Sequence, residues 1–390
     1  MKDILTREIL RYLKEAKEET IGLIEELCRI PAPSKHEERR AEFCKNWLER
    51  QGAKGVYIDE AKNVLYPVNC EGRLDIVLFS AHTDTVFPDL KEMPFTRDEK
   101  YLYSPGVGDD TTCLAVLMMI AKYVAQNNLQ PPCGILFAAN SCEEGLGNLK
   151  GIKQIMQDYK GRIRRAYTFD GQYDALVTKC VGSHRYELTF QTEGGHSFRD
   201  FGNRNAIIAA AKLIDGLSKC TVLQEGRGKT TYNVGIISGG TSVNTIAQNA
   251  SFLYEYRSDE KSDLEKMKCF FEAEVEKARK QGLAQITVKT IGERPCGGEI
   301  DETALNEMIA QAVQISQKHS GLSCVCTSGS TDCNIPMSLG VPAVCVGSYL
   351  GHGEHTREEK VLIESIPVGL KIAAELVLGY FIKTIGENYV

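Results

Sequence analysis

The segment LDIVLFSAHTDT, residues 74–85, joins an almost continuous apolar run to a group of polar side chains. Two later runs, GILFAAN at 134–140 and AYTFD at 166–170, have the same character, because each is short, apolar and ends in an amide or a carboxylate. Such runs are typical of strands buried on both faces of a sheet, and the segment 112–126 between them is predicted as a helix. The pattern predicts an α/β fold: a mixed, largely parallel sheet with flanking helices.

The middle of the chain follows a different order. Between about 183 and 292 the hydrophobic pattern predicts strand, helix, strand, strand, helix and strand, which is the β-α-β-β-α-β order of ferredoxin-like domains. A sheet of this kind can close on itself as a small independent domain. We therefore expect 183–292 to be inserted into a larger domain formed by 1–182 and 293–390, which agrees with a chain too long for one core.

Composition excludes several classes of function. The chain has 46 basic and 52 acidic residues, a net charge of −6 and no cluster of Lys and Arg, so it lacks the positive surface that a nucleic-acid backbone requires. Its longest apolar run, Cys113–Ala121, is far shorter than the roughly 20 residues that cross a bilayer. The charged N-terminus shows no secretory signal, and fourteen cysteines without a CxxC pair indicate reduced, buried thiols. These features predict a cytoplasmic protein that binds neither nucleic acid nor a membrane.

Side chains that can bind metal ions follow the apolar strands. Taken alone, each has an ordinary structural explanation, such as a turn, a helix N-cap or a solvated loop. However, four successive strands, at 74–80, 134–140, 166–169 and 341–347, are each followed by His, Asp or Glu, and a carboxylate-rich two-metal site requires ligands from separate loops at one sheet edge. The candidate residues are His82, Asp84, Asp109, Asp110, Glu143, Glu144, Asp170 and His355.

Seven segments resemble those of the M20 metallopeptidases, and they occur in the family's order: AHTDT, GVGDD, NSCEEG, TFDG, TEGGHSF, SGSTD and GHGEHTREE. That family includes carboxypeptidases, dipeptidases, tripeptidases and N-acyl-amino-acid deacylases. The resemblance extends over essentially the whole chain and includes the inserted domain. It implies that 1–182 and 293–390 form a catalytic domain of the zinc-exopeptidase type and that 183–292 is a lid and dimerisation domain.

The resemblance also implies a set of metal ligands. His82 and Asp170 would bind one ion, Glu144 and His355 would bind the other, and Asp109 would bridge the two. We therefore expect two divalent metal ions per chain. Zinc suits the imidazole ligands, while the number of carboxylates leaves manganese and cobalt as alternatives.

The chain departs from the family pattern at one position. Many members have Asp-x-Lys-x-Gly after the bridging position, where this chain has Asp-Asp-Thr-Thr-Cys from Asp109 onward. The sequence leaves open which of two adjacent carboxylates faces the metals. Asp110 is therefore an alternative to Asp109 as the bridge.

Five further residues take roles from the same resemblance. Glu143 would act as the general base, and Asp84 would orient the histidine ligand two residues before it. His196 would reach the active site of a partner subunit and stabilise the oxyanion, although the sequence leaves action within its own chain open. Asn244 and Arg257 would hold the substrate, with Arg257 making a forked contact to a terminal carboxylate; the alternative for Arg257 is an exposed cation at a sheet edge.

We therefore expect a homodimeric exopeptidase, dipeptidase or tripeptidase that cleaves peptide or amide bonds in small substrates, through a water held between two metal ions and activated by Glu143. An N-acyl-amino-acid deacylase would use the same site and is the main alternative. A non-catalytic ligand-binding protein on this scaffold would have lost a ligand or the base, and all are present. A thiol enzyme would need a cysteine beside a histidine; Cys142 and Cys333 lie near the motifs, but packing explains both.

Overall fold

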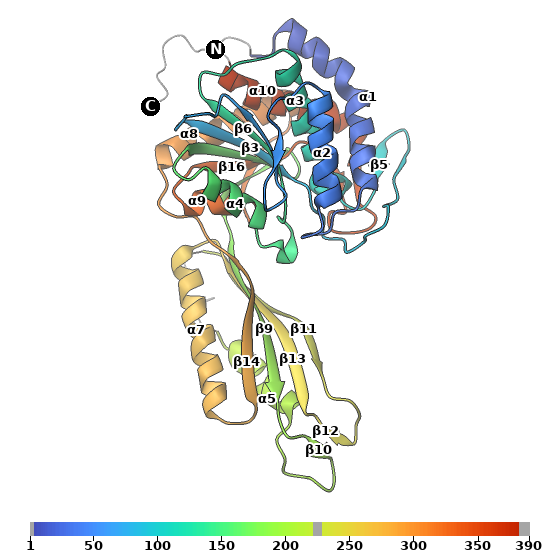
Figure 1. Cartoon of the computed structure of the whole chain (residues 1–390). Coiled ribbons are helices and arrows are strands. Elements are labelled where there is room, and N and C mark those ends of the chain that lie inside the picture. Colours follow the sequence, from blue (N-terminus) through green and yellow to red (C-terminus); the bar gives the residue numbers. More distant parts are fainter. Residues whose placement is uncertain (1–3, 221–227, 382–390) are drawn as a thin grey trace. The chain divides into compact units, whose positions relative to one another are not determined.

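In the computed structural model, which describes residues 4–220 and 228–381, the apolar runs of the sequence are neighbouring strands of one eight-stranded sheet (Figure 1). In spatial order these strands are β1 (Tyr57–Ile58), β2 (Val64–Val68), β6 (Gly134–Asn140), β3 (Ile76–His82), β7 (Ile163–Phe169), β16 (Ala343–Val346), β8 (Ala175–Cys180) and β15 (Val325–Gly329). The central strands β6, β3, β7 and β16 are parallel, and β2 and β8 flank them in the antiparallel sense. The predicted fold class, a mixed α/β layer with a parallel centre, is confirmed.

Contacts divide the chain into two units, which we describe separately. Unit 1 comprises Met1–Thr178 and Glu299–Val390, and it contains the eight-stranded sheet. Unit 2 comprises Lys179–Gly298 and is inserted between the two parts of unit 1.

Helices cover both faces of the sheet in unit 1. They are α1 (Arg7–Arg29), α2 (Glu38–Arg50), α3 (Cys113–Gln126), α4 (Lys150–Asp158), α8 (Glu302–Ser320), α9 (Asn334–Ser338) and α10 (Ile366–Leu378). Helices α1, α3 and α10 contact one another, and α8 packs on α10, while α4 and α9 form a second group (Figure 1). On β3, Val77 and Phe79 join the main core and Leu78 is buried on the opposite face. Every residue of β3 is therefore buried, which explains its unbroken apolar run.

The parallel strands bring their carboxyl ends to one edge of the sheet. His82 at the end of β3 is in register with Asn140 at the end of β6, and Ser80 is in register with Thr168 near the end of β7. A small second sheet lies in the same unit and has the order β17 (Gly351–His352), β18 (Lys360–Leu362), β5 (Tyr101–Tyr103) and β4 (Thr96–Arg97). Its β18–β5 pairing joins the loop before β18 to the segment after β5.

In its described residues, unit 2 has a four-stranded antiparallel sheet and two helices. In spatial order its strands are β11 (Thr230–Gly239), β13 (Asn249–Ser258), β9 (Gly182–Gln191) and β14 (Gln285–Arg294), and its helices are α5 (Ala206–Leu217) and α7 (Lys261–Lys280). The alternating residues Phe252, Tyr254 and Tyr256 of β13 are buried, and Tyr254 stacks on Phe271 of α7. These side chains belong to a hydrophobic core of unit 2 that is separate from the core of unit 1. A short ladder of β10 (Gly195–His196) with β12 (Thr245–Ile246) completes the unit.

The C-terminal helix ends earlier than the sequence predicts. The apolar pattern after the strand 341–347 predicts a helix from about 366 to 384. In the structure α10 ends at Leu378, and a single 3-10 turn follows over Gly379–Phe381. Residues 382–384 lie outside the described part of the chain. Within that part, no helix has both the length and the apolar character needed to cross a membrane.

Candidate metal centre

Six of the predicted residues meet at the carboxyl edge of the unit 1 sheet. They are His82 at the end of β3, Asp109 before α3, Glu143 and Glu144 after β6, Asp170 after β7 and His355 between β17 and β18. Their ligand atoms form three groups, within each of which all atoms lie within 4.8 Å of one another: His82 with Asp109 and Asp170, Asp109 with Glu144 and His355, and His82 with Glu143 and Glu144. The cluster therefore has two lobes that share Asp109.

Asp109 and Asp110 point in different directions. Asp109 Oδ1 lies 3.0 Å from His82 Nε2, and Asp109 Oδ2 lies 3.0 Å from His355 Nε2, so one carboxylate faces both lobes. Asp110 is fully buried, and its Oδ2 accepts a hydrogen bond of 2.9 Å from the backbone N–H of His82. The peptide bond between the two aspartates is cis. The geometry thus places Asp109 between the two lobes, whereas Asp110 contacts the backbone at the end of β3.

The two glycines before Asp109 are explained by close packing. Gly106 has φ +74°, and a Cβ there would lie 2.7 Å from Thr85 Cγ2. A Cβ on Gly108 would lie 2.7 Å from the ring of Tyr349. The segment GVGDD therefore packs closely against Thr85 and Tyr349, and a side chain at either glycine would displace Asp109.

Asp84 contacts His82 mainly through its backbone. Its carbonyl oxygen lies 2.9 Å from His82 Nδ1, whereas its carboxylate lies 3.5 Å from that nitrogen. Because a carbonyl only accepts, Nδ1 carries a proton, and Nε2 is the ring nitrogen that faces Asp109. The carboxylate of Asp84 instead accepts from the backbone N–H groups of Glu143 and Glu144, at 2.9 Å each, and from Ser34 Oγ at 2.6 Å. Asp84 therefore ties the histidine loop to the glutamate loop.

Crowding of acidic groups shifts the pKa values in the cluster. Burial and then the charge of Asp109 raise the pKa of Glu144 to about 7, and the same two causes raise the pKa of Asp170 well above its usual range. Hydrogen bonds to Asp109 and Glu144 raise the pKa of His355 to about 11. Burial opposes the charged form of His82, but the adjacent aspartate pair raises its pKa overall. Without a cation the cluster retains protons, and these protons occupy the positions that metal ions would take.

His196 and Asn244 lie together in unit 2. The β10–β12 ladder pairs His196 with Thr245, and the Ser197 N–H donates to the Asn244 carbonyl at 3.0 Å. The ring Nδ1 of His196 accepts from the N–H groups of Phe198 and Arg199, at 3.2 and 3.4 Å. A ring nitrogen that accepts carries no proton, so Nε2 of this exposed residue carries the ring proton and can donate a hydrogen bond.

Arg257 lies near the other end of β13. Its guanidinium makes a forked pair with Glu255, with distances of 3.0 and 3.1 Å. The alternative that Arg257 is a cation at a sheet edge is wrong, because β13 lies between β11 and β9. At about 3.3 Å per strand residue, Arg257 is roughly 26 Å along β13 from Asn249, the end of β13 nearer in sequence to Asn244. Within one chain, Arg257 and Asn244 cannot both contact the same small molecule.

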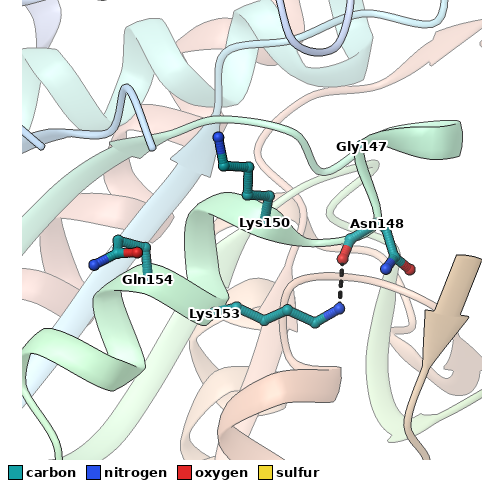
Figure 2. Close-up of a pocket in the computed structure, with 5 residues that line it drawn as sticks. All are labelled: Gly147, Asn148, Lys150, Lys153 and Gln154. Carbon is teal, nitrogen blue, oxygen red and sulfur yellow. Dashed lines mark hydrogen bonds between the residues drawn. The ribbon is translucent and has the colours of Figure 1, made fainter. Parts of the chain in front are cut away.

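A cavity of about 400 Å³ opens beside helix α4, shortly after the two glutamates in sequence, and is shown in Figure 2. Its lining residues are Gly147, Asn148, Lys150, Lys153 and Gln154, and Lys153 Nζ donates to the Asn148 carbonyl at 2.8 Å. None of these side chains is a carboxylate or an imidazole. The cavity is therefore separate from the metal centre, and its lysines would repel a cation.

Comparison with known proteins identifies the family. Residues 78–379 match the sequence model of peptidase family M20/M25/M40, which is more than half of the chain. The chain belongs to this family. It is 24% identical over 365 residues to the uncharacterized protein YqjE of Bacillus subtilis (strain 168), a match that covers 87% of this chain and 92% of YqjE.

Solved structures have the same fold. A tripeptidase (SAV1512) from Staphylococcus aureus subsp. aureus Mu50 superposes with a TM-score of 0.72 at 22% identity, covering 94% of this chain and 98% of the tripeptidase. The Bacillus subtilis protein YXEP, described as a dinuclear metal-binding peptidase from the M20 family, gives a TM-score of 0.64 at 17% identity and covers 94% and 98% of the two chains. These superpositions show that the chain has the same fold as the two structures.

The donor set of this M20/M25/M40 chain fits two divalent cations. Imidazole and carboxylate ligands converge from separate loops, and all but one of these ligating side chains are at least partly buried. Glu144 Oε1 is a buried atom 3.2 Å from His355 Nε2, a nitrogen that it shares with Asp109 Oδ2 at 3.0 Å. Buried, incompletely paired carboxylate oxygens are costly unless a cation lies beside them.

Two buried carboxylates of the centre were not predicted. Asp332, in the SGSTD segment, accepts from Asn140 Nδ2 at 2.6 Å, and Glu359, in the GHGEHTREE segment, lies behind Asp109. Both belong to segments that carried the family resemblance, so the segments themselves were the available signal. The thiol alternative has no support, because burial raises the pKa of both Cys142 and Cys333 to about 12 and keeps them as neutral thiols.

Proposed function

We propose that this chain is a dinuclear metal-dependent hydrolase that cleaves peptide or amide bonds in small substrates, as an exopeptidase, dipeptidase or tripeptidase. The observation that carries the proposal is the position of Asp109, with one carboxylate oxygen 3.0 Å from each of the two histidine rings. A carboxylate shared by two groups of ligands is what a two-ion site requires. The tripeptidase fold and the family membership support small peptides as substrates.

The proposed ligands follow the two lobes of the cluster. His82 and Asp170 would hold one ion, Glu144 and His355 the other, and Asp109 both. Zn²⁺ is favoured by the imidazoles, and Mn²⁺ or Co²⁺ by the carboxylates. When bound, such ions polarise a substrate carbonyl and lower the pKa of a water molecule.

We assign proton transfer to Glu143. Glu144 belongs to both the His82 group and the His355 group, whereas Glu143 belongs to the His82 group alone, which favours Glu144 as a ligand and Glu143 as a base. Asp84 fixes the backbone N–H of Glu143 at 2.9 Å. From this position the Glu143 carboxylate would take a proton from the attacking water and deliver it to the leaving nitrogen.

His196 is assigned to the oxyanion of a second copy of the chain. Its Nε2 is a donor, as that role requires. The edge strand β11 exposes Ile236 and Ile237, and helix α5 of the same unit exposes Ile207 and Ile208. Apolar side chains on an unpaired edge strand favour pairing with another sheet edge, so a homodimer formed through unit 2 is the proposed assembly.

A small peptide or an N-acyl amino acid with a free carboxylate is the proposed substrate. Arg257 would bind that carboxylate in the forked geometry that it now makes with Glu255. A peptide should then be cleaved with a kcat/KM about tenfold or more above that of its C-terminal amide, since the amide leaves the guanidinium unmatched. Arg257→Ala should remove this preference, and Lys289→Ala on β14, which β9 separates from the strand of Arg257, should keep it. Equal rates for acid and amide in the wild type would reject the role of Arg257.

The state of the cysteines supports a cytoplasmic location. All fourteen lie in the described part of the chain, and all are free thiols. Free thiols in this number are typical of a reducing compartment.

Metal analysis with a substrate panel tests the main proposal. The purified protein should hold close to two divalent ions per chain, and chelation should abolish hydrolysis of dipeptides, tripeptides and N-acetyl amino acids until metal is restored. Cleavage of the N-acetyl amino acids alone would assign the chain to the deacylases. Full activity after complete removal of metal would refute the proposal.

Mixing two inactive variants tests the role of His196. Heterodimers of His196→Ala with Glu143→Ala contain one site in which both residues are intact, so part of the activity should return after subunit exchange. No recovery from heterodimers that are shown to have formed would refute action across the dimer.

A further inference from the structure

The segment that carries Asp109 is held from behind by Glu359. The carboxylate of Glu359 accepts three backbone N–H groups: Gly106 N–H at 2.6 Å on Oε2, and Gly108 N–H and Asp109 N–H at 2.8 Å each on Oε1. Glu359 is only 1% exposed, and about 250 residues separate it in sequence from the segment that it binds. Its two oxygens therefore accept three N–H groups from the four residues that end at Asp109.

The small second sheet explains how Glu359 reaches this position. Glu359 directly precedes β18, which pairs with β5, and its own carbonyl accepts from the Ser104 N–H at 3.3 Å. The chain after β5 then turns into the segment 106–109. The same loop before β18 also carries His355, four residues earlier. One short strand pair thus sets the positions of both the His355 loop and the Asp109 segment.

The segment Val107–Thr112 forms an irregular π-helical turn, and the N–H groups of Gly106, Gly108 and Asp109 lie at its start, where no preceding helical carbonyl accepts them. Asp109 has φ −95° and ψ +96°, which are not helical values, although α3 begins four residues later. On the other side, the ring of Tyr349 fills the space next to Gly108. A buried N–H that loses its acceptor is costly, and the segment cannot move toward Tyr349 to find another.

We propose that Glu359 is a positioning residue for the bridging carboxylate: by accepting the three N–H groups it holds Asp109 in reach of His82 on one side and His355 on the other. This inference rests on the proposed function in one respect, the two ions that share Asp109. It predicts that a substitution of Glu359 lowers the affinity for both ions, because Asp109 offers one oxygen to each lobe.

Metal titration of the metal-free full-length protein by calorimetry, with Zn²⁺ and with Mn²⁺, tests the proposal. Glu359→Gln keeps the size of the side chain but replaces one acceptor by an NH₂ group, and Glu359→Asp keeps the charge but is one methylene too short. Both should bind both ions about tenfold or more weakly than the wild type, since at least one buried N–H is left without an acceptor.

Glu375→Gln is the matched control. Glu375 is also a buried glutamate of unit 1 with several hydrogen bonds, from Lys318 and His319, but it lies on α10 and does not contact the Asp109 segment. This variant should unfold at a lower temperature and yet bind both ions as the wild type does. The proposal is wrong if the Glu359 variants also bind both ions as the wild type does. It is equally wrong if these variants lose affinity for only one of the two ions.

Amide hydrogen exchange in the metal-free wild type covers the case in which neither Glu359 variant folds. The N–H groups of Gly106, Gly108 and Asp109 should exchange slowly although they lie at the start of an irregular turn and bond to the Glu359 side chain rather than to a helix or strand carbonyl. Fast exchange at these three positions would overturn the proposal. If the wild type fails to bind two ions, the proposed function fails, whereas two ions bound equally by wild type and variants refute only the role of Glu359.

Discussion

Neighbouring acidic residues in this centre have different environments because the backbone turns them apart. Asp109 faces both histidine rings, while Asp110 accepts from the His82 N–H behind the strand. Glu144 belongs to two of the three ligand groups, one with His82 and one with His355, while Glu143 belongs only to the group with His82. Residue type alone does not separate the members of either pair, so single substitutions within a pair are the sharpest test of the assigned roles.

Glu143→Ala should lower kcat by roughly 10²–10⁴ while two ions remain bound, which is the range expected for loss of a general base. Glu144→Ala should instead lower metal affinity, because it removes a ligand of the His355 lobe. Elemental analysis after dialysis and steady-state kinetics at saturating metal measure the two effects. Equal loss of metal in both variants would show that the two roles are assigned in the wrong order.

Asp109→Asn should weaken the binding of both ions by about tenfold or more, since it removes a charge that both lobes share. Asp110→Asn should change metal affinity little. The carboxyl group of Asp110 contacts the backbone N–H of His82, and an asparagine keeps an oxygen that can accept from that N–H. The same calorimetric titration measures both, and loss of metal confined to Asp110→Asn would make Asp110 the bridge.

Much of the centre could be predicted from residue types and their positions at strand ends. His82, Glu143 and Asp170 follow apolar runs whose burial on two faces is visible in the sequence, and parallel strands must bring such ends together. The contacts of Asp84 with the Glu143 and Glu144 N–H groups could not be predicted, because they depend on the path of loops from two strands. The choice between Asp109 and Asp110 also depends on backbone angles that no side-chain pattern records.

At the scale of elements, the edge strand β11 is the proposed contact surface of the homodimer. Ile236 and Ile237 are 59% and 56% exposed there, which is unusual for adjacent isoleucines in a strand. Ile237→Lys should shift the protein from dimer to monomer, because it places a charge on the edge that would pair. Light scattering after size exclusion measures the mass.

Leu74→Lys is the control for the β11 variant, since Leu74 is 64% exposed in unit 1 and outside the proposed interface. It should leave the mass unchanged. A wild type that is monomeric at all concentrations tested would remove the basis for the β11 interface.

Elements with strong patterns were predictable and short ones were not. The long strands and helices of unit 2 follow from alternating and helical spacing, as in β13. The small sheet of β17, β18, β5 and β4 consists of strands of two or three residues, which are too short to show a period. This sheet brings Glu359 to Asp109. The element that the sequence predicts least well therefore positions Asp109, the proposed bridging ligand.

At the scale of the whole molecule, the metal-free protein should lose stability as pH rises from 5 to 8. The raised pKa values of Glu144 and Asp170 mean that the folded chain binds more protons than the unfolded chain in this range, and the raised pKa values of His82 and His355 act in the same direction. This contribution is complete below the unfolded-state pKa of each group and is lost as pH rises through the folded-state value. The Tm should fall by roughly 2–4 °C for each kcal/mol lost.

Added metal should reverse this trend, since ions displace the same protons and bind better at higher pH. At 100 times its Kd, an ion stabilises the folded state by about 2.7 kcal/mol. Differential scanning calorimetry across pH, with and without metal, measures both slopes. A metal-free Tm that increases from pH 5 to 8 would contradict the assignment of these raised pKa values to the cluster.

The way in which unit 2 is connected has a consequence for how such proteins change over time. The chain enters unit 2 on β9 and leaves it on β14, and these strands are neighbours with Ser183 in register with Arg294. Paired strand residues lie about 5 Å apart, so a short loop can bridge the gap if the insert is removed, and another insert with close ends can take its place. A gene can therefore gain, lose or exchange the segment that encodes unit 2 in a single recombination event, without altering the strands that carry the ligands. Substrate range and assembly can diverge among descendants while the hydrolytic chemistry is inherited intact.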